Sequence, residues 1–100
     1  WGGYEIATRV ILHNLLPEGA AIPANRGQLA LLIWTEKGKP EPAAQPAFAD
    51  VADADMAKAA QWCAEQGIME AKGADTFKPE GWTPKFNVIE TWNKAFPKAA

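Results

Sequence analysis

The chain is short of the residues that build disulfides and metal centres, with one cysteine and one histidine among its 100 residues. Cys63 has no internal disulfide partner, which leaves the redox compartment open. His13 has no second ligand at a metal-binding spacing, so we expect a surface histidine and no metal site. No apolar run approaches the roughly 20 residues that cross a bilayer, so the sequence predicts no membrane span.

Charge of one sign is not in excess either, because the formal net charge is only −2. No stretch combines clustered lysine and arginine with aromatic residues, so a nucleic-acid partner is disfavoured. Glu18, Glu70 and Glu80 fall in expected loops, and nothing in their spacing pairs an acid with a base. The sequence therefore predicts a non-catalytic protein that uses no cofactor.

Three aspartates, Asp50, Asp53 and Asp55, alternate through an alanine-rich segment and resemble a calcium loop at first sight. The segment lacks the central glycine and the distal glutamate of such a loop. A structural role is favoured instead, with Asp53 or Asp55 capping a helix that follows.

Tryptophan is abundant by contrast, with five copies. A large flat apolar face with one N–H donor suits both cores and binding surfaces. Helical spacing predicts that Trp34, Trp62 and Trp92 pack in the core. Trp82 has no such period, and two alternatives are open: a hydrophobic staple against the next helix, or a platform for a sugar ring.

The apolar residues recur at helical spacing, and the sequence predicts one all-α domain with four helices. They cover residues 4–13, 25–37, 56–66 and a segment from Thr83 to just before Pro97. Asn25 is the expected cap of the second helix, with Gln28 reaching back to close a capping box. Thr83 is the expected cap of the fourth, with Pro84 as its first helical residue. The expected stops are Gly38 and Gly67.

The two halves of the chain align with each other. A shift of 53 positions pairs Asn14 with Gly67, and a shift of 58 pairs Trp34 with Trp92. Each half is a helix, a stop, two apolar residues, a loop and a capped helix, so an internal repeat is predicted. The expected organisation is one domain over residues 1–100, made of two helix–loop–helix repeats packed as a small bundle. Motif one covers 1–38, a proline-rich extended connector 38–46, and motif two 47–97.

Short stretches of the second half resemble the S-layer homology domain family. They are FADV at 48–51, AAQWCAEQGIM at 59–69, FKP at 77–79 and the capped helix from Thr83. The family pattern is Phe-x-Asp-Val, a helix ending in Gly-Ile, a loop with Phe-x-Pro, and then Ile-Thr-Arg-Ala-Glu. In the first half, ANRGQLALLIW at 24–34 resembles the Thr-Arg-Ala-Glu helix, with Asn, Gly and Gln in place of Thr, Ala and Glu.

The resemblance implies a module that holds an exported bacterial protein on the cell surface by gripping a secondary cell-wall polysaccharide, often one capped with a pyruvate ketal. Three motifs usually form a pseudo-threefold bundle, and the glycan lies in grooves between them. Two motifs here give at most one complete groove, so further motifs would come from outside this chain.

Carried over by position, Arg26 is the motif arginine, whose planar fork of donors suits a carboxylate. The second half has Pro84 in that slot, with Lys85 as the nearest cation. The predicted ligand-binding residues are Arg26, Trp82, Thr83 and Lys85, at an extracellular, cell-wall location. Two alternatives stay open: Arg26 is a solvated first-turn residue, or the whole domain is a scaffold or protein-interaction module without glycan binding.

Overall fold

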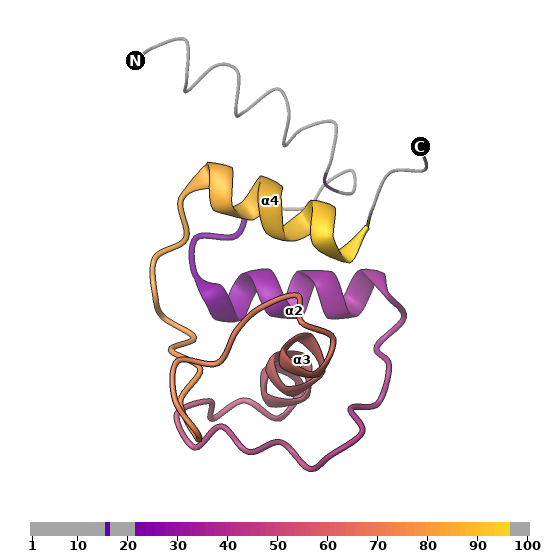
Figure 1. Cartoon of the computed structure of the whole chain (residues 1–100), viewed down its shortest axis with the longest axis vertical. Helices are drawn as coiled ribbons and strands as arrows, with labels where there is room; N and C mark the ends of the chain where they lie inside the picture. Colours follow the sequence, from indigo (N-terminus) through magenta and orange to yellow (C-terminus); the bar gives the residue numbers. More distant parts are fainter. Residues whose placement is uncertain (1–15, 17–21, 97–100) are drawn as a thin grey trace, which may run out of the picture.

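The computed structural model describes Leu16 and residues 22–96, and in that part of the chain it contains three helices and no strand (Figure 1). The helices are α2 over Arg26–Glu36, α3 over Ala54–Glu65 and α4 over Lys85–Ala95. The all-α prediction is confirmed, whereas the helix predicted over residues 4–13 lies outside the described residues. Within residues 22–96, no helix has the length and hydropathy that a membrane span requires.

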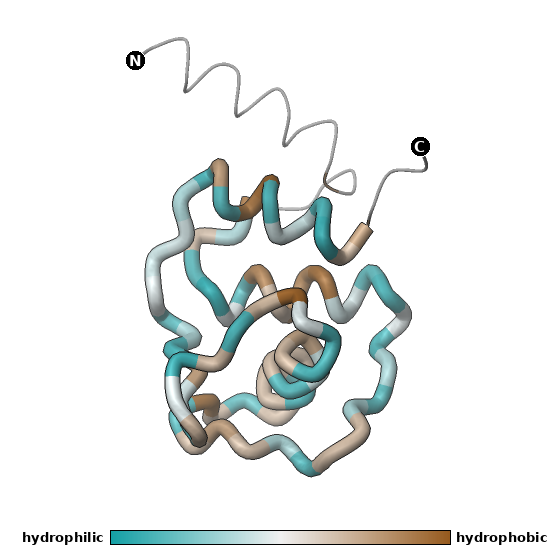
Figure 2. Tube along the Cα trace, in the orientation of Figure 1, coloured by the Kyte–Doolittle hydropathy of each residue, from teal (hydrophilic) through white to brown (hydrophobic). Residues whose placement is uncertain are grey.

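Helix α2 is the centre of this fold. Helix α3 crosses one side of it, and α4 lies alongside it and runs in the same direction (Figure 1). Figure 2 shows the hydrophobic segments of α2 in the middle of the fold, between the other two helices. Leu29 and Ile33 are fully buried there, and Trp34 is only 3% exposed. Each such aliphatic side chain contributes about 1.5–3 kcal/mol by leaving water.

Helix α3 meets α2 through a face of small residues. Ala59, Ala60 and Cys63 have no exposed surface, and Cys63 Sγ lies 3.9 Å from the carbonyl oxygen of Ala30 on α2. Small side chains let the two helix backbones approach closely, as the spacing predicted. Burial also raises the pKa of the Cys63 thiol to about 12, so the group is protonated and unreactive at neutral pH.

The starts of α2 and α3 follow the predicted capping. Asn25 Oδ1 accepts the Gln28 N–H at 2.8 Å, and Gln28 Oε1 accepts the Ala24 N–H at 2.9 Å, one residue before the partner expected in a capping box. At α3 the cap is Asp53, whose carboxylate accepts a first-turn backbone N–H at 2.8 Å. Asp55 lies inside the first turn, where a negative charge suits the helix dipole.

Both predicted stop glycines adopt the left-handed backbone, with φ of 88° at Gly38 and 73° at Gly67. Each helix closes in a Schellman motif, in which the residue after the glycine donates to a carbonyl of the last turn. Ile68 N–H donates to Cys63 O at 2.9 Å, and Lys39 N–H donates to Trp34 O at 2.9 Å. Backbone conformation therefore explains these glycines, because an added Cβ would meet nothing within 4 Å at either position.

The start of α4 differs from the prediction. Thr83 is not its cap: the Thr83 N–H donates to Ala24 O at 3.1 Å, and the residue is 8% exposed. Pro84 is not the first helical residue, because its ψ of 154° is extended, and it is itself the cap, without a side-chain bond. The reason is a short antiparallel pairing of Asn25 with Trp82, which draws Thr83 against the segment before α2.

The proline-rich connector, residues 38–46, contains no helix or strand, in keeping with the predicted extended segment. It is fastened at both ends to neighbouring helices. Trp34 Nε1 donates to Pro40 O at 2.7 Å, and the Glu65 carboxylate accepts two connector N–H groups at 2.7 and 2.9 Å. The connector therefore runs over the surface with its backbone polar groups partly satisfied by α2 and α3.

Candidate functional site

The Phe-x-Asp-Val segment before α3 fastens the loop over residues 68–81 that follows α3. The Asp50 carboxylate accepts the Phe77 N–H at 3.0 Å and the Lys78 N–H at 2.8 Å. These backbone bonds, that from Phe77 first, lower the pKa of Asp50, although desolvation opposes them. The Phe48 and Phe77 rings pack with centroids 5.2 Å apart. Asp50 therefore has a structural role, because it holds this loop against the segment before α3.

The same loop covers the N-terminus of α2. The Arg26 N–H donates to Gly81 O at 3.0 Å, and the Gly27 N–H donates to Pro79 O at 2.8 Å. A Cβ on Gly27 would lie 2.9 Å from Pro79 Cβ and 2.6 Å from Met56 Sδ, so only glycine permits this approach. Free N–H groups at a helix start commonly bind anions. At α2 these donors are already occupied by loop carbonyls.

The Arg26 side chain also holds this loop. Its Nε–H donates to Phe77 O at 2.9 Å, and a terminal N–H donates to the Glu70 carbonyl oxygen. The guanidinium lies over the Phe77 ring, 4.6 Å from its centroid. Burial lowers the pKa of Arg26, and the Glu70 charge opposes that shift. Arg26 is thus a partly buried brace, which differs from the solvated first-turn residue offered as one alternative.

An open groove of about 430 Å³ lies beside this brace, between the 68–81 loop, the start of α2 and one face of α4. Three of the four predicted site residues, Arg26, Trp82 and Thr83, line it together. Lys85 lies in the first turn of α4, half-buried, and is not among the lining residues. The geometry thus brings most of the predicted set to one place, although Arg26 and Trp82 are 56 positions apart in the sequence.

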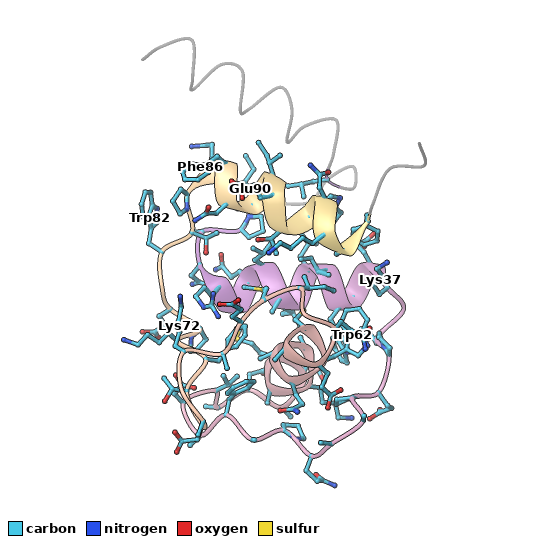
Figure 3. The ribbon with its side chains drawn as sticks, in the orientation of Figure 1. Lys37, Trp62, Lys72, Trp82, Phe86 and Glu90 are labelled. Atoms are coloured by element: carbon cyan, nitrogen blue, oxygen red, sulfur yellow. The ribbon has the colours of Figure 1, made fainter. Side chains whose placement is uncertain are left out.

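Trp82 stands at the rim of the groove with 79% of its surface exposed and projects away from the ribbon (Figure 3). That exposure contradicts the staple alternative, which requires the ring to pack on the next helix. The three other tryptophans that the structure describes behave as core residues, as predicted. Trp34 and Trp92 are buried, and Trp62 packs partly buried against the core. Among these four, only Trp82 presents its ring to solvent.

Positive charge collects in the groove of a chain whose overall net charge is −2. Its lining contains four cationic side chains, Arg26, Lys72, Lys78 and Lys94, against the single carboxylate of Glu70. Lys72 and Trp82 lie on the same side of the molecule in Figure 3. Such a concave, cationic surface raises the local concentration of anions.

The sequence analysis missed the three lysines. One could have been found, because Asn87, Thr91 and Lys94 recur at helical spacing and form a polar wall of the groove. Lys72 and Lys78 lie in a loop with no periodic signal. Their position depends on the long-range bonds of Asp50 and Arg26 to that loop, which local patterns do not reveal.

Residues 47–81, from just before Phe48 through α3 to the end of this loop, match the family model of the S-layer homology domain. This segment is similar to one S-layer homology motif. The match confirms the resemblance found in FADV, the Gly-Ile helix end and FKP, and it ends one residue before Trp82. No curated protein and no solved structure matches the chain.

S-layer homology domains are non-catalytic modules that anchor proteins at the cell surface or cell wall by binding wall polymers. The match covers one motif and includes neither α2 nor α4. The division of the chain into two motifs around the connector therefore stays a prediction. The groove lies where the matched motif meets those two helices.

Proposed function

We propose that this domain tethers a larger exported bacterial protein to secondary cell-wall polysaccharide, and that the glycan lies in the groove beside Arg26, Trp82 and Thr83. The carrying observation is the combination of an exposed tryptophan with a surplus of positive charge in one groove, next to an S-layer homology motif. Aromatic rings bind the apolar faces of sugars, and cations bind acidic substituents such as a pyruvate ketal. Neither feature serves the core.

The competing proposal is a scaffold or protein-interaction domain without glycan binding. It is supported by the use of Arg26 as a brace, since a guanidinium that donates to two loop carbonyls has fewer donors left for a ligand. The two proposals differ in one measurable respect. Only the tether requires the solvent-exposed ring of Trp82.

Co-sedimentation with isolated cell-wall sacculi tests the tether, with the polysaccharide present and after it is stripped by acid. We expect pelleting with intact sacculi only. Trp82→Ala should weaken that binding about tenfold, a loss of about 1.4 kcal/mol. Phe86→Ala is the matched control, because Phe86 is also an exposed aromatic, at 47%, but does not line the groove.

Equal loss in both variants would indicate nonspecific apolar adsorption. Absence of pelleting by the wild-type domain would favour the scaffold. Pelleting that survives stripping of the polysaccharide would place the partner in the peptidoglycan.

A further inference from the structure

The four cations of the groove are not equivalent, and the difference assigns them different tasks. Arg26 is engaged on three sides: its Nε–H by Phe77 O, a terminal N–H by Glu70 O, and its face by the Phe77 ring. The side-on pair of donors, Nε and one terminal nitrogen, is one of the two forks with which a guanidinium grips a carboxylate. Here that fork already grips the loop.

The charge of Arg26 is also partly answered inside the protein. Glu70 is its electrostatic partner and lines the same groove. Because the Glu70 carboxylate offsets the charge of Arg26, the excess positive charge of the groove comes from its three lysines. Lys78 interacts electrostatically with the Asp50 carboxylate and helps to lower its pKa.

Neither Lys72 nor Lys94 has a carboxylate partner of this kind among the described residues. The ion pair between Lys58 and Glu41 lies away from the groove and involves neither of these two lysines. Lys72 is exposed on the loop, and Lys94 is exposed in the last turn of α4. These two uncompensated positive charges therefore lie on different walls of one groove.

We infer that the groove takes a glycan segment bearing more than one negative charge, held by Lys72 and Lys94 with help from Lys78, while Arg26 positions the loop without contacting the ligand. This inference rests on the proposed function and names its ligand chemistry. A single carboxylate would neutralise one wall and leave the other cation uncompensated. A segment with two or more acidic groups satisfies both walls and crosses the groove past the Trp82 ring.

Calorimetric titration with trigalacturonic acid, which carries a carboxylate on each ring, tests the charge requirement. The fully methyl-esterified trimer is the neutral control, and galacturonic acid is the single-charge control. At low ionic strength, about 20 mM, we expect the acid trimer to bind at least tenfold more tightly than either control. Equal binding of the acid and esterified trimers would overturn the inference.

The double variant Lys72→Gln with Lys94→Gln should weaken trimer binding about tenfold and flatten its dependence on salt. Lys39→Gln with Lys58→Gln removes the same charge outside the groove and should leave binding within about twofold of the wild type. Arg26→Lys keeps the charge but cannot make both loop bonds. It should lower Tm. At about 10 °C, where the protein is folded by circular dichroism, its affinity should fall less than that of the groove double variant, because the loop that carries Lys72 is held less firmly, and its salt dependence should stay near that of the wild type.

Loss of binding in folded Arg26→Lys equal to that in the groove double variant would assign ligand contact to Arg26 and overturn the inference. If the two lysine double variants lose the same trimer affinity, the effect depends only on net charge, and this result would also overturn the inference. Sedimentation with sacculi separates this inference from the tether. If sacculi pellet both lysine double variants equally well, the tether is supported but the lysine site is not. If trimer binding depends on the groove lysines but the domain does not bind sacculi, the anion-binding groove is supported but the tether is not.

Discussion

Helices α2 and α4 have the same length, 11 residues each, and carry a buried tryptophan in nearly the same slot, yet they do different work. At the shift of 58 positions that pairs Trp34 with Trp92, the buried Ile33 of α2 corresponds to Thr91 of α4. Helix α2 has neighbours on two faces, so that position is core. On α4 the same position faces the groove.

The comparison explains how a groove can form in so small a domain. Leu29 of α2 likewise corresponds to Asn87 of α4, which is exposed and lines the groove. A repeat of identical helices would bury both faces or expose both. On α4, Val88 and Trp92 remain in the core, while the polar residues at neighbouring positions leave the adjacent face exposed to solvent.

The largest effect that separates the two helices is truncation at the paired core position. Ile33→Ala should reduce the free energy of unfolding by about 2–5 kcal/mol, because it opens a cavity at a fully buried site. Thr91→Ala should change it by no more than about 0.5 kcal/mol. Urea denaturation followed by circular dichroism measures both. Similar costs at the two positions would mean that α4, too, is packed on this face.

A second difference lies in how the two helices begin, because only α2 starts under a loop. Gly27→Ala should cost about 1–3 kcal/mol, since the new Cβ meets Pro79 Cβ at 2.9 Å and Pro79 O at 3.1 Å. Gly73→Ala, whose Cβ would have ordinary contacts at 3.4 Å, should cost much less. Comparing the two urea midpoints tests this, and a tolerated Gly27→Ala would show that the loop moves freely off α2.

The loop over α2 also gives the protein a pH dependence. The folded pKa of Asp50 is lowered, so its stabilisation is complete above the ordinary value of 3.8 and disappears as the pH falls through the lowered folded value. Asp50→Asn removes this titration. The stability difference between wild type and variant should therefore be constant near neutral pH and shrink below about pH 4, in urea titrations at each pH. A difference independent of pH would show that the Asp50 charge does not hold the loop.

Local rules predicted much of the fold because the signals are local. The Asn25 and Asp53 caps and the Gly38 and Gly67 stops each involve residues within one turn of the helix end. Thr83 failed because a backbone partner 59 residues away, Ala24, competed for it. A cap rule considers only the next turn and cannot register such a competitor.

The sequence identified which residues line the site better than it identified what each of them does there. Motif position led to Arg26, and the missing helical period led to Trp82; both line the groove. The bonds from Arg26 to Phe77 and Glu70 span 51 and 44 positions, so its use as a brace had no local signature. The same long-range closure brings Lys72 to the groove.

A small effect on stability is expected from giving α4 the apolar residues of α2, and this exchange is the sharpest test of the comparison. Asn87→Leu with Thr91→Ile places on α4 the residues found at the corresponding positions of α2. Because Asn87 and Thr91 line an open groove between the described segments, stability should change by less than about 1 kcal/mol, helped slightly by the helix propensity of leucine. Binding to sacculi should nevertheless fall, since the polar wall opposite the 68–81 loop is lost.

Sedimentation velocity checks that the new apolar face has not caused dimerisation. Unchanged sacculus binding by the monomeric variant would remove α4 from the binding surface and leave the loop and Trp82 alone to hold the glycan.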